Sequence, residues 1–148
     1  MPNILDEIVA AKRIELAESK SQVSLADLEI AAAGQPRPLN LSGALLGGGV
    51  RLIAEVKKAS PSRGLLMPDF DHLKLAETYA GNGAAAISVL TNADHFQGSI
   101  RHLEAVHGVA NPRGIPVLRK EFIFDPYQVY ESRAHGADAI LLIAAVLD

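Results

Sequence analysis

The stretch Leu52-Ile-Ala-Glu-Val-Lys-Lys-Ala-Ser-Pro-Ser-Arg-Gly64 decides the fold and indicates where a site lies. It begins with apolar residues typical of a buried strand and then breaks into a polar loop. Because side chains alternate along a strand, Glu55 and Lys57 share one face, one strand step apart. A charged pair on an otherwise apolar strand face is costly unless that face lines a functional cavity. The alternative is a strand end with a solvated charge pair, and this stretch alone leaves both interpretations open.

A second segment, Ile115-Pro-Val-Leu-Arg-Lys-Glu-Phe122, favours the functional interpretation. It is again a short apolar strand that ends in charge, with Lys120 near its carboxyl end and Arg119 alternating outward. A helical pattern follows each of the two strands, which is typical of a parallel sheet. Such folds place their chemistry at the carboxyl edge of the sheet. We therefore expect lysines from both strands to meet there.

The composition excludes several classes of protein. The chain has 148 residues, of which 49% are hydrophobic, enough for one domain with a real core. A formal net charge of −3 gives no electrostatic case for nucleic acid or for an acidic membrane surface. No apolar run approaches the roughly 18 residues of a membrane span, and the N-terminus lacks the pattern of a signal peptide. We expect a cytoplasmic domain without nucleic-acid or membrane partners.

The sequence favours neither a metal nor a cofactor. It contains no cysteine, which excludes disulfides and thiolate metal sites. Its five histidines form no His-x-x-His or His-x-x-x-His pair, so a histidine metal site is disfavoured. Neither of the two common glycine-rich phosphate-binding motifs occurs.

We assign residues 1–48 to an N-terminal helical extension. Its first helix spans residues 3–20 and is capped by Asn3. Lys12 falls inside the apolar stripe of that helix. We expect its stem to lie along apolar surface while its ammonium reaches water. The alternative is that the helix lies over an active site and aims this lysine inward.

Further local signals complete the extension. The run Ser24-Leu-Ala-Asp27 predicts a capping box that opens a second helix ending at Gly34. A short third helix near residues 41–46 leads into Gly47-Gly-Gly49, a flexible hinge before the first strand.

Residues 49–148 alternate between strand and helix, the pattern of a parallel sheet covered by helices. The expected strands lie near residues 51–57, 85–90, 116–121 and 139–143. The expected helices lie near residues 71–82, 99–107 and 126–135. Asp125 and Pro126 form a good helix start, with a capping carboxylate and a proline at the first helical position. The last strand is apolar on both faces, as in buried parallel strands.

Three blocks of the sequence resemble signatures of the indole-3-glycerol phosphate synthases. They are Ile53-Ala-Glu-Val-Lys-Lys-Ala-Ser-Pro-Ser62, His95-Phe-Gln-Gly-Ser99 and Val117-Leu-Arg-Lys-Glu-Phe-Ile123, in the family's order. Gly136-Ala-Asp-Ala-Ile-Leu-Leu-Ile143 is similar to the family's fourth strand, so the resemblance covers nearly the whole chain. It implies an α/β fold of the (β/α)8 TIM-barrel family. Here that means the helical extension plus the first four strands, with residues 49–148 as the first half of the barrel.

The resemblance also marks what these residues lack. A complete barrel needs about 250 residues. In this family, strands five to eight carry a glutamate taken as the general base, an asparagine and the loops that hold the substrate phosphate. We therefore expect the chain alone to be inactive, and to associate with itself through open barrel edges.

The resemblance implies a carbon–carbon lyase of tryptophan biosynthesis. The family closes an indole ring on 1-(2-carboxyphenylamino)-1-deoxyribulose 5-phosphate, a phosphorylated small molecule, with loss of carbon dioxide and water and without a cofactor. Lys120 matches its general-acid lysine. Lys57 matches a lysine that binds anionic groups of the substrate, and Glu55 matches a glutamate that holds the lysines and takes part in dehydration. Four further residues match substrate-lining positions: Ser60, Phe96, Phe122 and Leu141.

Other interpretations compete with this one. A half-barrel that serves only as a folding or assembly module, without catalysis, has the same residues, so the sequence does not separate the two. Another phosphate-handling barrel, such as phosphoribosylanthranilate isomerase, is disfavoured by the run from Glu55 to Ser62. For single residues, Lys120 is otherwise a strand-end lysine reaching solvent, and Phe122 is otherwise part of the core. Glu121 stands where the family usually has aspartate, and it alternates away from the expected cavity.

Overall fold

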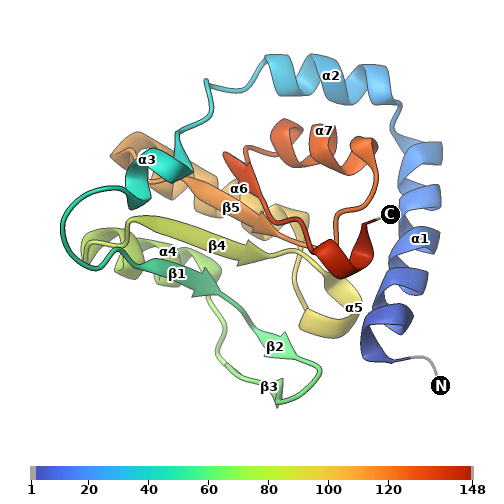
Figure 1. The fold of residues 1–148 in the computed structure, drawn as a ribbon, viewed down its shortest axis with the longest axis horizontal. Helices are drawn as coiled ribbons and strands as arrows, with labels where there is room; N and C mark the ends of the chain where they lie inside the picture. The colour runs from blue at the N-terminus through green and yellow to red at the C-terminus, as the bar shows by residue number, and fades with distance from the viewer. Residues whose placement is uncertain (1–2, 148) are drawn as a thin grey trace.

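Four parallel strands form the sheet on which the rest of the chain packs (Figure 1). The computed structural model describes residues 3–147. The strands are β1 (Ile53–Val56), β4 (Ala86–Leu90), β5 (Val117–Lys120) and β6 (Ala139–Ile140), and they lie in that order. Each neighbouring pair is parallel, so every connection crosses over through a helix. This is the repeating unit of a (β/α)8 barrel, and the expected partial barrel is confirmed.

The main core lies between the sheet and the helices that follow its first two strands, α4 (His72–Gly81) and α6 (Ile100–Ala110). The helix α7 (Pro126–Ala134) follows β5. Side chains of β1, β4 and β5 meet those of α4 and α6 in a buried cluster, formed by Val56, Ala76, Ile87, Val89, Leu103, Val106, Ala110, Val117 and Ala137. The predicted start of α7 is confirmed, because the Asp125 carboxylate accepts a hydrogen bond from the backbone N–H of Tyr127 at 2.8 Å.

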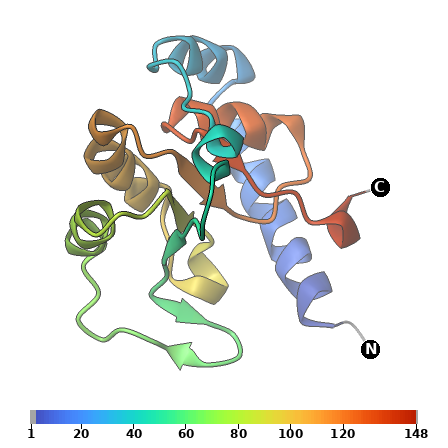
Figure 2. The ribbon, with the colours of Figure 1, turned by 60° about the vertical axis from the view of Figure 1, so that its left-hand side comes forward.

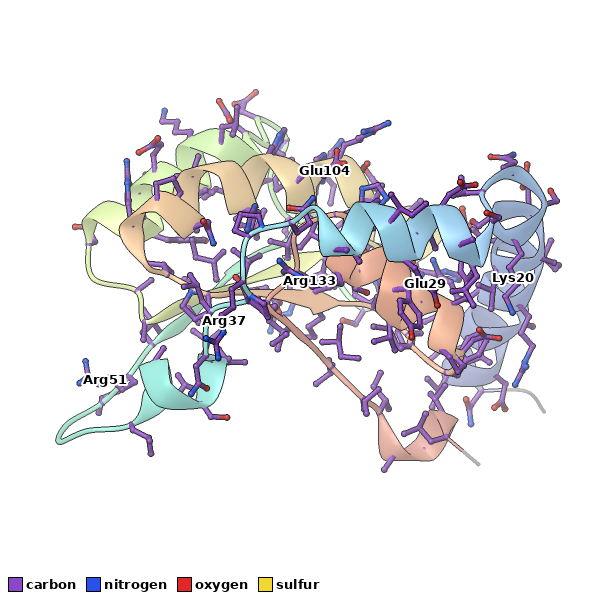
Figure 3. The ribbon with its side chains drawn as sticks, turned by 90° about the horizontal axis from the view of Figure 1, so that it is seen from above. Lys20, Glu29, Arg37, Arg51, Glu104 and Arg133 are labelled. Carbon is purple, nitrogen blue, oxygen red and sulfur yellow. The ribbon has the colours of Figure 1, made fainter. Side chains whose placement is uncertain are left out.

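Three helices precede the first strand: α1 (Ile4–Gln22), α2 (Leu25–Ala33) and α3 (Leu41–Leu45). The strands point toward α1, which runs past their carboxyl ends (Figure 1). Seen from above, α2 lies over α7 (Figure 3), and a second buried cluster of Leu16, Leu28, Tyr127 and Ala134 joins these helices. Asn3 caps α1 as predicted. No helix within residues 3–147 combines the length and the apolar character needed to cross a membrane.

Several local predictions need correction. The capping box expected at Ser24 is half formed: its hydroxyl accepts from the Asp27 N–H, but it also donates to the Asp27 carboxylate at 2.6 Å. That bond competes with the return contact to the Ser24 backbone. Gly34 ends α2 at φ −76° and so does not adopt the left-handed conformation. The single-turn helices α5 (Ala93–Phe96), η1 (Asn111–Arg113) and η2 (Ala144–Val146) were not expected.

The last strand is shorter and more exposed than its apolar sequence predicts. Only Ala139–Ile140 pairs with β5, and Leu142 is 55% exposed. The reason is position: β6 ends the sheet and has a neighbour on one side only. A second difference lies in the expected polar loop, which contains an antiparallel hairpin of β2 (Ala59–Ser60) and β3 (Gly64–Leu65). This hairpin projects from the end of β1, away from the sheet (Figure 1, Figure 2).

Lys12 does not reach water, so that prediction is wrong. The residue is 4% exposed, and its Nζ lies 3.1 Å from Oε2 of Glu121 and 2.6 Å from Oε2 of Glu15. The side chain of Glu121 is fully buried, and a buried carboxylate requires a cation nearby. That requirement outweighs the hydration of the ammonium and turns Lys12 inward.

Candidate active site

Glu55 brings two lysines together at the carboxyl end of the sheet. Its Oε2 lies 2.9 Å from Nζ of Lys120, and its Oε1 lies 3.3 Å from Nζ of Lys57. The hydroxyl of Ser88 donates to Oε2 of Glu55 at 3.4 Å. Glu55 lies in β1, Ser88 in β4 and Lys120 in β5, so three adjacent strands supply this cluster. The alternation of side chains along each strand explains why these residues face the same side.

The charge of Glu55 depends on its two lysines. Burial alone raises the pKa of its carboxyl, but hydrogen bonding and attraction from Lys120, and then from Lys57, outweigh burial and lower the pKa below its ordinary value. Glu55 is therefore a carboxylate at neutral pH. The side chains of Lys120 and Lys57 remain 41% and 35% exposed. Both ammonium groups are thus held in place and still accessible to an anionic ligand.

An open cavity of about 490 Å³ lies beside this cluster. Lys57 lines it together with Ser60 and Arg63 from the β2–β3 hairpin. Phe96 and Phe122 form an apolar wall, with ring centroids 6.2 Å apart and planes tilted by 38°. The first turns of α1 contribute further apolar lining through Ile4, Leu5 and Ile8. The cavity therefore joins cations, hydroxyl groups and aromatic rings, as a ligand with an aromatic ring and acidic groups requires.

Four of the seven predicted site residues line the cavity. They are Lys57, Ser60, Phe96 and Phe122. Glu55 and Lys120 do not line it; Glu55 forms an ion pair with the lining residue Lys57, and Lys120 forms one with Glu55. Leu141 is not among the lining residues; it follows β6, and its backbone N–H donates to the carbonyl of Arg119.

Arg119 turns away from the cavity, as alternation predicts. It donates to the Glu131 carboxylate at 2.8 Å and to the Ser132 hydroxyl at 3.1 Å, both on α7. Sequence reasoning missed Ser88, although it is the one polar residue of β4. It also missed the apolar lining from α1, because nothing local in that helix identifies the surface it meets. Among residues 3–147, no group of three or more acidic or histidine side chains is arranged to hold a metal.

The sequence model described as indole-3-glycerol phosphate synthase matches residues 5–148. The chain belongs to the indole-3-glycerol phosphate synthase family. An indole-3-glycerol phosphate synthase of Roseiflexus sp. (strain RS-1) is 50% identical over 153 residues, which covers 100% of this chain and 56% of the relative. One from Dehalococcoides mccartyi (strain BAV1) is 50% identical, covering 97% of this chain and 56% of the relative. One from Mycobacterium tuberculosis is 46% identical, with 98% and 52% covered. The chain thus spans about half the length of these relatives.

Proposed function

We propose that the complete protein containing these residues is an indole-3-glycerol phosphate synthase. It would close the indole ring of 1-(2-carboxyphenylamino)-1-deoxyribulose 5-phosphate with loss of carbon dioxide and water, as a carbon–carbon lyase of tryptophan biosynthesis. The observation that carries this proposal is Glu55, which holds lysines from two strands beside a cavity with two phenylalanine rings. We also propose a cytoplasmic location, no nucleic-acid partner and no cofactor, because the reaction needs only proton transfer and charge stabilisation.

The three charged side chains divide the chemistry. Lys120 donates a proton to the substrate carbonyl as the aromatic ring attacks it, a step that contributes about 10²–10⁴-fold to the rate. Lys57, on the cavity lining, faces the carboxylate that leaves as carbon dioxide. Glu55 holds both ammonium groups and takes part in the proton transfers that expel hydroxide. Support for this division comes from the two partly exposed lysines that are bound to a single carboxylate.

The aromatic part of the substrate has a matching surface. Phe96 and Phe122 flank its ring, and apolar burial with stacking contributes about 1–3 kcal/mol for each contact. Ser60, at the end of β2, supplies a hydroxyl on the polar side. We keep Leu141 as a proposed substrate contact only because it matches a substrate-lining position of the family; it does not line the cavity.

The test is an assay of the complete protein for the fluorescent indole product and for one carbon dioxide per turnover. We expect activity in the wild type, and a loss of turnover of roughly 10²-fold or more in Lys120→Ala. The matched control is Lys74→Ala, which removes an exposed lysine of α4 and leaves turnover unchanged. Absence of product in the wild type, or full turnover in Lys120→Ala, contradicts the proposal.

A second candidate is a half-barrel that serves only in folding or assembly. The observation in its favour is the apolar exposure at the two outer strands, with Leu52 61%, Ile53 40% and Leu142 55% exposed. Such faces and edges associate with another chain. If the 148-residue chain is produced alone, we expect self-association in gel filtration and no ring closure. A soluble monomer that turns over substrate would contradict both expectations, and an encoding frame that continues into four further strands would favour the enzyme over the module.

A further inference from the structure

Glu121 lies directly after the acid lysine and is fully buried, yet it does not face the cavity charges. Its Oε2 accepts a hydrogen bond from Oγ1 of Thr91 at 2.9 Å and lies 3.1 Å from Nζ of Lys12. Its Oε1 accepts from the backbone N–H of Phe122 at 2.9 Å and from Nδ2 of Asn92 at 3.3 Å. One carboxylate thus binds groups from α1, from the end of β4 and from the segment after β5.

Three of these four contacts, those with Phe122, Asn92 and Lys12, lead to a wall of the cavity. Phe122 is held through its own backbone N–H. Asn92 caps α5, and its side-chain oxygen accepts from the His95 N–H at 3.0 Å, so the same amide group steadies the helix that carries Phe96. Lys12 belongs to α1, whose first turns line the cavity. The three walls therefore meet at Glu121.

The ion pair with Lys12 is the contact that makes this arrangement stable. A buried carboxylate without a counter-charge is strongly destabilising. The nearest nitrogen of Arg119 is 4.0 Å from Glu121 Oε2, and this guanidinium already pairs with Glu131 at 2.8 Å. Lys12, 4% exposed, is the closer cation. Loss of Lys12 removes the nearest cation from the buried Glu121 carboxylate, whereas loss of Glu121 still leaves Lys12 its 2.6 Å ion pair with Glu15.

We propose that Lys12 and Glu121 are positioning residues of the active site. Their ion pair holds α1 against the end of β5 and sets the spacing of Phe96, Phe122 and the first turns of α1 around the aromatic part of the substrate. Neither residue touches the substrate. This inference rests on the proposed function and extends it to residues outside the charge cluster.

The experiment compares four variants of the complete protein: Lys12→Met, Glu121→Gln, the double variant and Lys20→Met. Lys20 is the matched control, since it lies in the last turn of the same helix (Figure 3) and forms a 2.7 Å ion pair with Asp125 while 45% exposed. We expect each single variant at the buried pair to raise KM about tenfold and to change kcat by less than about threefold. The control should leave both constants unchanged.

The double variant separates positioning from general stability. It removes both buried charges, so its unfolding midpoint should recover relative to Lys12→Met, which leaves the buried Glu121 carboxylate without its nearest cation. Its KM should stay raised, because two neutral side chains no longer tie α1 to β5. A KM that returns to the wild-type value together with stability would show a merely structural role and overturn the proposal.

Amide hydrogen exchange provides a readout that does not depend on activity. In Lys12→Met we expect faster exchange in the first turns of α1 and at Phe122, with α6 unchanged. If the wild type makes no product, the proposed function fails while this measurement still decides whether the pair holds the walls. Unchanged exchange at both places, or a uniform acceleration that includes α6, would overturn the inference.

Discussion

Each end of the sheet holds a carboxylate, but the groups that bind the two carboxylates differ. At the amino end, the side chain of Asp138 is fully buried and accepts from the backbone N–H groups of Val117 at 2.8 Å and Leu39 at 2.9 Å. At the carboxyl end, Glu55 is bound by two lysines whose side chains stay 41% and 35% exposed. These backbone donors satisfy the hydrogen-bonding oxygens of the Asp138 carboxylate, and they join β5 to the segment before α3. The lysines bound to Glu55 remain partly accessible and can bind a ligand. The same chemical group therefore stabilises the fold at one end and prepares a site at the other.

The largest expected effect concerns Glu55. In Glu55→Gln the two lysines lose their common counter-charge, so both ammonium positions shift and turnover of the complete protein falls by about 10²-fold or more. Stability should change little, because partly exposed ion pairs contribute little to folding. Steady-state kinetics and a denaturant titration together check this. A large loss of stability with normal turnover would show that Glu55, like Asp138, stabilises the fold and has no part in the reaction.

The corresponding experiment at the amino end of the sheet is Asp138→Ala. It leaves the backbone N–H groups of Val117 and Leu39 without their acceptor, which costs about 2–4 kcal/mol of unfolding free energy. Turnover of the folded fraction should match the wild type, since Asp138 lies at the opposite end of the sheet from the charge cluster. Denaturant unfolding gives the first quantity and kinetics well below the midpoint the second. A turnover defect in fully folded Asp138→Ala would break the division between the two ends.

A smaller effect distinguishes the two lysines from each other. Lys57 lines the cavity, so Lys57→Ala should raise KM by about tenfold, as expected when a cation facing an anionic group is lost. Lys120→Ala should instead act mainly on kcat, with less change in affinity. Initial rates over a range of substrate concentrations separate these constants. Equal losses of affinity with unchanged turnover in both variants would contradict the assigned roles.

The smallest effect is a pH dependence of stability. The pKa of Glu55 is lowered in the folded protein, so the unfolded chain binds a proton at a higher pH than the folded one. Its contribution to stability is present above the ordinary value near 4.5 and is lost as the pH falls through the lower folded value. Urea unfolding from pH 6 downward should therefore show a shallower acid loss in Glu55→Gln than in the wild type. Parallel curves for the two proteins would mean that the lysines do not stabilise the ionised form.

Local chemistry made much of this protein predictable. Alternation along a strand placed Glu55 and Lys57 on one face and Arg119 on the other, and the capping residues Asn3 and Asp125 marked helix starts. Each of these signals acts between residues a few positions apart, where backbone geometry sets direction without reference to the rest of the chain. They were enough for the order of the four parallel strands and of the longer helices, and for the convergence of Glu55, Lys57 and Lys120.

Contacts between distant segments decided the rest. Lys12 turned inward because its partner Glu121, 109 positions away, is buried, and no pattern within α1 encodes that meeting. The exposure of Leu142 follows from the position of β6 in the sheet, and the apolar lining from α1 follows from where that helix packs. Burial and charge pairing depend on what surrounds a side chain in space. The sequence alone therefore determined which groups are available, and the tertiary structure decided which of them meet.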